Sequence, residues 1–165
     1  MAGPAEISVC PGCGSRLPAV DGPIHAYMTS SPACWAAFGE VMAREYQNPD
    51  LMPVHRLSVD AWAAQHPGDG SRQAIQSVGL HLARLMVQLD DGLSGEAANA
   101  AMLGFASRKA ELPVLEAPPF SMTVADVVGA VAPDDHAEAV RRWARAVWND
   151  WRAEHDFIRH WARSS

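Results

Sequence analysis

The sequence predicts an all-α fold, a helical bundle of about five to six helices that follows an irregular N-terminal lobe. Three observations support this prediction. Apolar residues recur at helical spacing in two long segments, residues 75–89 and 140–158. No segment shows the sustained alternation of apolar and polar residues that is typical of a half-buried strand. The first 30 residues are rich in Gly and Pro and carry several turn signals, which favour irregular structure.

The first half of the chain supplies two predicted helices after the irregular segment 1–30. Ser31 is a good N-cap and Pro32 suits the first helical position, so a helix is expected from there to about residue 47, where Asn48-Pro49 ends it. A second, short helix is expected to begin at Ser58 and to end at the breaker His66-Pro67-Gly68. Together these signals place two helices between residues 31 and 66.

The second half of the chain has the stronger helical periodicity. A third helix is expected over residues 71–90, and a fourth, capped by Ser94, over about residues 95–109. Three prolines between residues 113 and 119 predict a loop. Thr123 and Asp126 form a capping-box pattern that opens a short helix to about residue 131. The last and longest helix is expected from residue 133 to about residue 161.

All three cysteines lie in the first 34 residues, and two of them belong to the run Cys10-Pro11-Gly12-Cys13-Gly14. Such a turn, a zinc knuckle, directs two thiolates toward one small volume. Zn²⁺ prefers four ligands in a tetrahedron, and the next candidates are His25 and Cys34. Cys34 falls in the first turn of the predicted first helix, where the helix dipole favours a thiolate. The sequence therefore predicts a Cys3His zinc site with a structural role.

Other interpretations of the cysteines remain open at this stage. A disulfide framework normally has an even number of cysteines and an export signal, and a redox Cys-x-x-Cys usually begins a helix in a strand-rich domain. A nucleoside deaminase site would need a His-x-Glu triplet upstream of the knuckle, whereas His25-Ala26-Tyr27 lies downstream and has no acid. Three buried thiols that bind nothing are a further alternative. His55 or His66 could also replace His25 as the fourth ligand.

The length of 165 residues predicts a single domain, 1–165, with a zinc-binding lobe at 1–35 and a helical bundle at 36–165. A net charge of −6 argues against general nucleic-acid binding. No apolar run is long enough for a membrane span, and the first residues lack the features of a signal peptide. Free thiols without an export signal predict a cytoplasmic location.

The chain resembles a group of small, mostly bacterial proteins catalogued as a domain of unknown function. The resemblance covers nearly the whole chain and implies that the named Cys and His positions belong to the family's pattern, but it implies no activity. It rests on the segments Cys10-Pro11-Gly12-Cys13-Gly14, Asp21-Gly22-Pro23-Ile24-His25-Ala26-Tyr27, Ser30-Ser31-Pro32-Ala33-Cys34-Trp35, Val59-Asp60-Ala61-Trp62-Ala63-Ala64-Gln65-His66-Pro67-Gly68 and Gln76-Ser77-Val78-Gly79-Leu80-His81-Leu82.

A second group of chemically competent residues follows the cysteines: His55, Asp60, His66 and His81. A hairpin turning at residues 67–68 would bring the short second helix alongside the third. Two histidines and a carboxylate could then form a catalytic metal site or a general acid–base set acting on a small-molecule substrate of unknown identity. Structural roles explain the same residues, since Asp60 suits a helix start and His66 can cap carbonyls at a helix end.

The sequence thus leaves three functional classes: a protein with a structural zinc ion, a small metal-dependent enzyme using the second group, and a zinc-stabilised interaction module. The last class is suggested by six tryptophans, of which Trp148 falls off the apolar stripe of the final helix. For that class we expect a homodimer, because two-fold oligomers are common. No Gly-rich phosphate loop or serine-hydrolase elbow is present in the sequence.

Overall fold

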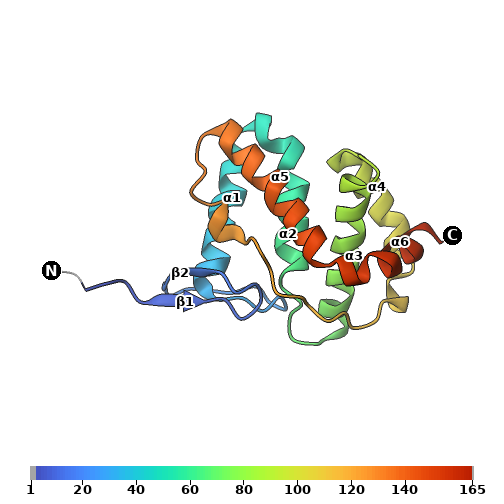
Figure 1. Ribbon diagram of the computed structural model, residues 1–165, viewed down its shortest axis with the longest axis horizontal. Helices are drawn as coiled ribbons and strands as arrows, with labels where there is room; N and C mark the ends of the chain where they lie inside the picture. Colours follow the sequence, from blue (N-terminus) through green and yellow to red (C-terminus); the bar gives the residue numbers. More distant parts are fainter. Residues whose placement is uncertain (1–2, 165) are drawn as a thin grey trace.

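The computed structural model describes residues 3–164 and confirms the all-α prediction. The described chain forms six α-helices and one small two-stranded sheet, with the sheet at one end of the bundle and α6 at the other (Figure 1). The elements are β1 (Ile7–Val9), β2 (Arg16–Pro18), α1 (Pro32–Gln47), α2 (Met52–Ala64), α3 (Arg72–Leu89), α4 (Gly95–Ala106), α5 (Pro133–Asp150) and α6 (His155–Arg163).

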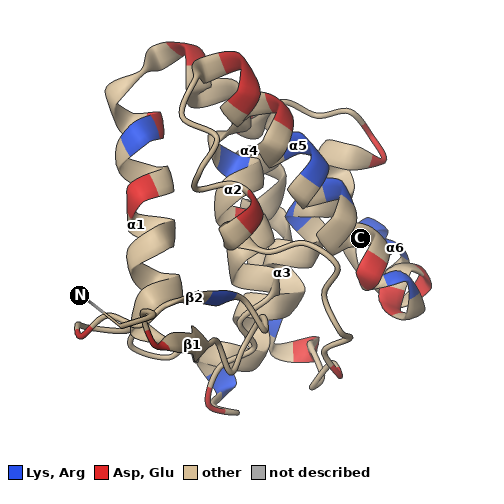
Figure 2. Cartoon of the chain, turned by 60° about the vertical axis from the view of Figure 1, so that its left-hand side comes forward, with Lys and Arg blue, Asp and Glu red and all other residues tan. Residues whose placement is uncertain are grey.

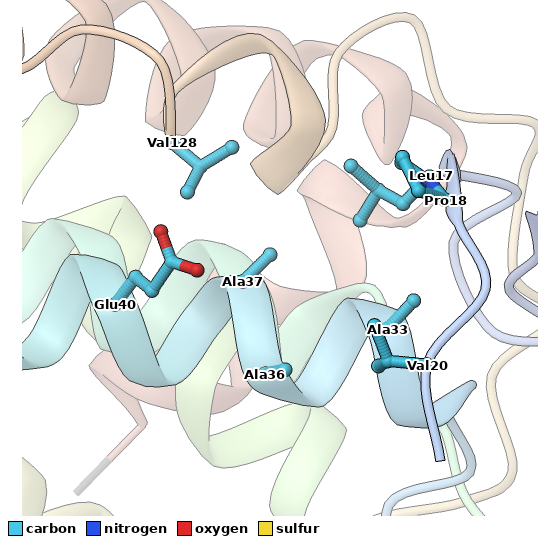
Figure 3. Close-up of a pocket in the computed structure, with 8 residues that line it drawn as sticks. All are labelled: Leu17, Pro18, Val20, Ala33, Ala36, Ala37, Glu40 and Val128. Carbon is cyan, nitrogen blue, oxygen red and sulfur yellow. The ribbon is translucent and has the colours of Figure 1, made fainter. Parts of the chain in front are cut away.

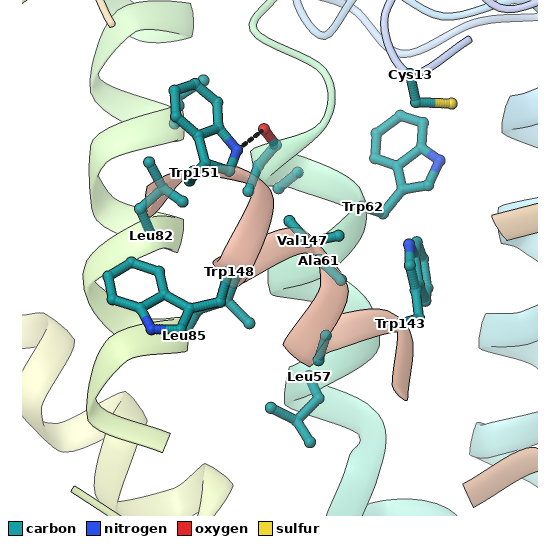
Figure 4. Close-up of a cluster of buried hydrophobic side chains, with 14 of the residues drawn as sticks. Cys13, Leu57, Ala61, Trp62, Leu82, Leu85, Trp143, Val147, Trp148 and Trp151 are labelled. Carbon is teal, nitrogen blue, oxygen red and sulfur yellow. Dashed lines mark hydrogen bonds between the residues drawn. The ribbon is translucent and has the colours of Figure 1, made fainter. Parts of the chain in front are cut away.

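Helix α2 is the centre of the bundle, because it packs against α1, α3, α4 and α5. The indoles of Trp62, Trp143 and Trp151 are fully buried around it. Figure 4 shows these rings together with apolar side chains of α2, α3 and α5. The Trp151 indole donates a hydrogen bond to the carbonyl of Ala64 at 3.1 Å, so even its polar atom is satisfied inside the core. The core is therefore built mainly by contacts among helices distant in sequence.

The N-terminal segment contains a short hairpin that the sequence pattern did not predict. Strands β1 and β2 pair antiparallel, with Ser8 opposite Leu17. In the segment that joins the two strands, the Cys10 amide donates to the Ser15 carbonyl and the Gly14 amide donates to the Cys10 carbonyl, both at 2.9 Å. The zinc-knuckle sequence is therefore the turn of the hairpin. Strands of three residues are too short to show a recognisable alternation.

Two helix boundaries differ from the expectation. The second helix begins at Met52 rather than Ser58, because Pro53 occupies its first turn, where the missing amide hydrogen costs nothing. The expected last helix is divided into α5 and α6 by a 3-10 turn at Arg152–Glu154. The capping box between Thr123 and Asp126 is confirmed, but it opens only a 3-10 turn.

The start of α5 carries surface charges that suit the helix dipole. Its first turn carries Asp134 and Asp135, and basic residues follow further along the helix (Figure 2). Acidic groups at a helix N-terminus are stabilised by the unpaired amides there. In residues 3–164, no helix combines the length and the apolar character needed to cross a bilayer.

Candidate metal centre

Three cysteines and one histidine converge at the junction of the hairpin with the bundle. The ligand atoms of Cys10, Cys13, Cys34 and His66 all lie within 4.8 Å of one another, and all four residues are buried. The Cys13 and Cys34 Sγ atoms are 3.7 Å apart. The His66 Nε2 atom is 3.4 Å from Cys10 Sγ and 3.4 Å from Cys34 Sγ. The cluster is compatible with a metal ion.

Three different elements supply these ligands. The hairpin turn presents Cys10 and Cys13, and α1 presents Cys34 in its first turn. Ser31 caps α1 by accepting a hydrogen bond from the Cys34 amide at 3.1 Å, and its own amide donates to Cys10 Sγ at 3.4 Å. His66 follows the end of α2. The cluster thus joins the N-terminal lobe to the first two helices of the bundle.

Backbone contacts set the orientation of His66. Its Nδ1 atom donates to the Trp62 carbonyl at 2.5 Å, so Nε2 is the ring nitrogen that faces the sulfurs. Its ring stacks on the Trp62 indole with centroids 3.8 Å apart. A second partner that fixes the tautomer is a regular feature of metal-binding histidines. The side chain is therefore held as a ligand would be.

Two glycines permit the close approach between the lobe and the His66 region. A Cβ atom at Gly12 would lie 2.5 Å from His66 Cδ2 and 2.5 Å from the Thr29 carbonyl oxygen. Gly68 has a φ of +82°, and a Cβ atom there would lie 2.1 Å from the Tyr27 carbonyl oxygen. Neither position has room for a side chain, so both glycines are needed to bring His66 against the knuckle.

The ligand groups perturb one another's proton affinities. Hydrogen bonds with Cys13 and Cys34 outweigh burial and hold the pKa of Cys10 far below its ordinary value. Hydrogen bonds with Cys10 and Cys13, together with burial, raise the pKa of Cys34. Burial lowers the pKa of His66, but its contacts with Cys10 and Cys13 outweigh burial and raise it to about 9. A metal ion must therefore displace protons as it binds.

His25, the fourth ligand expected from the sequence, is not part of the cluster. His66 is the histidine that lies beside the three cysteines. The Nδ1 atom of His25 accepts hydrogen bonds from the amides of Tyr27 and Met28, both at 3.2 Å. Its ring packs edge-on against Tyr27 and Trp35. His25 therefore organises the loop before α1. The variant in which His66 replaces it matches the observed cluster.

The second predicted group, His55, Asp60, His66 and His81, is not brought together at one point. His55 lies beside Glu45, a fully buried carboxylate on α1. Glu45 accepts hydrogen bonds from His55 Nδ1 at 2.8 Å, Ser58 Oγ at 2.5 Å and His136 Nε2 at 2.9 Å. This network joins α1, α2 and α5, and His66 belongs to the cysteine cluster instead. The prediction of one four-residue catalytic cluster is therefore wrong.

Asp60 and His81, the remaining two residues of that group, are in contact. A hairpin between α2 and α3 places His81 Nδ1 2.7 Å from the Asp60 carboxylate, as the turn at residues 67–68 suggested. The sequence did not predict that Arg84 would also pair with Asp60, at 2.6 Å, or that Gln88 would donate to it at 2.8 Å. The Asp60 carboxylate is fully buried, and three side chains of α3 compensate its charge, which offsets the cost of burying it.

Sequence reasoning missed Glu45, Arg84 and His136 as partners of the predicted residues. One signal was available for Glu45. It follows Val41 by four residues and Cys34 by eleven, so it continues the buried stripe of α1. A carboxylate on such a stripe needs compensating donors, and histidine is a natural one. Nothing in the local pattern identifies which histidines these are.

The tryptophans do not form an exposed surface. Trp148 is buried, its indole donates to Asp90 Oδ1 at 3.2 Å, and its ring stacks on His155 with centroids 3.8 Å apart. Trp148 is off the apolar stripe of the final helix because it packs inside the protein, and the homodimer stays a prediction without support from this residue.

An apolar cavity of about 240 Å³ lies between β2, α1 and the turn at Val128 (Figure 3). Glu40 contributes its only ionisable side chain. A cavity with a single carboxylate and no second polar partner offers little for catalysis.

Comparison with known proteins identifies the family but no activity. No curated protein and no solved structure matches this chain. Residues 8–152 match a family of unknown function, DUF5946, and this segment includes all four residues of the cysteine–histidine cluster. The match covers most of the chain, and the protein belongs to the DUF5946 family.

Proposed function

We propose that the protein binds one Zn²⁺ ion through Cys10, Cys13, Cys34 and His66, and that the ion has a structural role. The observation that carries the proposal is the spacing of the four ligand atoms. A tetrahedral Zn²⁺ with Zn–S bonds of about 2.3 Å and a Zn–N bond of about 2.0 Å requires S···S distances of about 3.8 Å and S···N distances of about 3.5 Å. Three of the six ligand pairs match these lengths: Cys13 and Cys34 Sγ are 3.7 Å apart, and His66 Nε2 is 3.4 Å from the Sγ atoms of Cys10 and Cys34. All six pairs lie within 4.8 Å.

The chemistry of the ligands favours zinc over other common ions. Thiolate and imidazole ligands in a tetrahedral set are typical of Zn²⁺, whereas Mg²⁺ and Ca²⁺ prefer oxygen. Three free cysteines also favour a reducing compartment, which supports a cytoplasmic location.

The number of ligands supports a structural rather than a catalytic role. Catalytic zinc usually keeps one coordination position for water or substrate, while structural sites use four protein ligands. Here four buried protein groups are available, and no described cavity is lined by any of them. The ion would fix the hairpin to α1 and to the end of α2, in a lobe with little apolar core of its own.

Metal analysis of the purified, untagged protein tests this proposal. We expect one zinc per chain, and we expect Co²⁺ substitution to give visible absorption bands of tetrahedral cobalt with a thiolate charge-transfer band. The three thiols should react slowly with a thiol reagent until a chelator is added. Zinc well below one per chain, or three thiols that react equally fast with and without chelator, would contradict the proposal.

A further inference from the structure

Helix α4 has an outer face without a charged side chain. The helix packs on α2 and α3 and lies at the edge of the bundle (Figure 1). Its sequence contains no ionisable residue from Ala97 to Ala106, and only Ala98 and Phe105 are buried. We propose that this face binds the same face of a second copy of the chain, so that two α4 helices pack antiparallel across a two-fold axis. The inference does not depend on the metal centre.

The outer face of α4 is apolar where a helix surface is normally polar. Leu103 is 79% exposed, more than any other large apolar residue in residues 3–164. Ala100, Leu103 and Ser107 are spaced by three and four residues, so they lie along one side of the helix, and Gly104 lies beside them. All four are exposed. Because a surface helix usually directs charged residues toward water, this face indicates that a partner covers it.

Opposite charges at the two ends of α4 identify a second copy as the partner. Glu96 lies in the first turn, and Lys109 begins the 3-10 turn that follows the helix. Both residues are exposed, and neither side chain forms an ion pair within residues 3–164. In an antiparallel pair, the acidic end of each helix meets the basic end of the other. Such complementary charges select the partner and its orientation.

Neighbouring charges leave these two groups as the free ones on the face. Arg108 Nη1 donates to the Trp161 carbonyl at 2.8 Å, and the guanidinium lies over the Trp161 ring. At the other end, Arg56 of α2 lies against Gly95, because a Cβ atom at Gly95 would be 2.9 Å from Arg56 Cγ. Gly95 is turned by about 100° from Glu96 around the helix, so Arg56 lies to the side of the proposed contact.

The shape of the face suits contact with itself. A two-fold axis near Met102 places Leu103 of each copy against Ala100 and Ala101 of the other. A groove of about 410 Å³ between α4 and the end of α6 begins there, with Ala101 and Gly104 in its lining. Small side chains allow two helices to approach closely. The same face therefore carries both a protruding leucine and a hollow, as a contact between identical surfaces requires.

The size of the face predicts a weak, reversible dimer. A helix of 12 residues is about 18 Å long, so the contact is smaller than the roughly 800 Å² per partner of a standard interface. We expect a dissociation constant on the order of 10–100 µM. Sedimentation equilibrium of the full-length, zinc-loaded protein from about 5 µM to about 1 mM brackets this value. The average mass should rise from 17.8 kDa toward twice that value.

A substitution at the centre of the face tests its location. Leu103→Lys places a charge from each copy near the axis and should weaken the dimer more than about tenfold. Val131→Lys is the matched control, an exposed apolar residue before α5, and should change the affinity by less than about twofold. Leu103→Gln provides a second variant without charge. Circular dichroism and zinc analysis confirm that each variant is folded.

A charge exchange tests the identity of the partner. Glu96→Lys and Lys109→Glu should each weaken the dimer about threefold to tenfold, because each replaces attraction with repulsion. The double variant should regain an affinity within about threefold of the wild type. The two groups are about 20 Å apart along one chain, beyond the screening length of about 8 Å at physiological salt. Rescue therefore requires that they meet between copies.

Three results would overturn the proposal. The first is a mass of 17.8 kDa at all concentrations, which would leave the face to a different protein. The second is a dimer that neither Leu103→Lys nor Leu103→Gln weakens, which would place the interface elsewhere. The third is a double charge variant that dimerises no more strongly than the single variants.

Discussion

The N-terminal lobe and the helical bundle are held together by different kinds of interaction. The lobe consists of a short hairpin and loops whose apolar residues, such as Ile7 and Val9, are about half exposed. The bundle buries three tryptophans around α2 and compensates two buried carboxylates, Glu45 and Asp60, with side chains from neighbouring helices. We therefore expect the lobe to depend on the cysteine–histidine cluster, whereas the bundle depends on many distributed contacts. Removing a single group should affect the two regions differently.

The largest effect is expected from Cys34→Ser. Structural zinc sites contribute apparent binding free energies of about 10–16 kcal/mol, so losing one of four ligands removes most of the metal's contribution to stability. We expect the variant to lose zinc and the hairpin amides to lose hydrogen-exchange protection. The amides of α3 and α5 should keep theirs, because their burial does not involve the cluster. Hydrogen-exchange mass spectrometry measures both, and an equal loss of protection in all helices would argue against two separately stabilised regions.

Glu45→Gln should have the next largest effect and should act on the bundle alone. The amide keeps one oxygen acceptor but places an NH2 group opposite a donor, in a fully buried position. We expect the free energy of unfolding to fall by about 3 kcal/mol while zinc remains bound. Glu40→Gln is the matched control, an exposed glutamate on the same helix, and should change stability by less than about 0.5 kcal/mol. Urea denaturation tests both, and loss of zinc from the Glu45 variant would contradict the separation of the regions.

The contribution of Glu45 should also depend on pH. Its pKa is lowered from the ordinary value of 4.5 despite burial, because His136, His55 and Ser58 donate to the carboxylate. A lowered pKa in the folded state stabilises the protein above the ordinary value, and this stabilisation is lost as the pH falls through the folded-state value. The stability difference between the wild type and Glu45→Gln should therefore be constant near neutral pH and shrink below about pH 4.5. A difference that grows on acidification would contradict this assignment.

A smaller contrast involves two glycines. Gly12→Ala places a methyl group against His66 and the Thr29 carbonyl, so we expect weaker zinc binding and a loss of about 2 kcal/mol. Gly39 lies within α1, and a Cβ atom there would have no neighbouring atom within 4 Å. Gly39→Ala should therefore stabilise the protein by about 0.5–1 kcal/mol. Thermal unfolding with zinc analysis distinguishes them. Equal effects of the two substitutions would mean that the close approach at Gly12 is unimportant.

The sequence predicted the features that depend on local chemistry. The caps at Ser31 and Ser94 and the grouping of the three cysteines follow from short patterns, and the structure contains all of them. The contact between Asp60 and His81 also followed from a hairpin with a short turn.

The features that could not be predicted depend on how distant segments pack. His66 is 32 residues from Cys34, and its place in the cluster depends on the end of α2 and on Gly68 fitting against the Tyr27 backbone. His25 is nearer in sequence but is held by its own loop. The partners Glu45 and His136 are 91 residues apart and meet only because α1 and α5 both lie on α2. Spacing along the chain carries no information about such pairs.

Zinc stoichiometry of two matched histidine variants tests the metal centre most directly. His66→Ala and His25→Ala each remove one imidazole beside the same lobe, but only His66 places a ring nitrogen among the three sulfurs. Elemental analysis after dialysis against a moderate chelator should give about one zinc per chain for the wild type and for His25→Ala, and well below one for His66→Ala. Retention of zinc by His66→Ala together with its loss from His25→Ala would contradict the proposed centre.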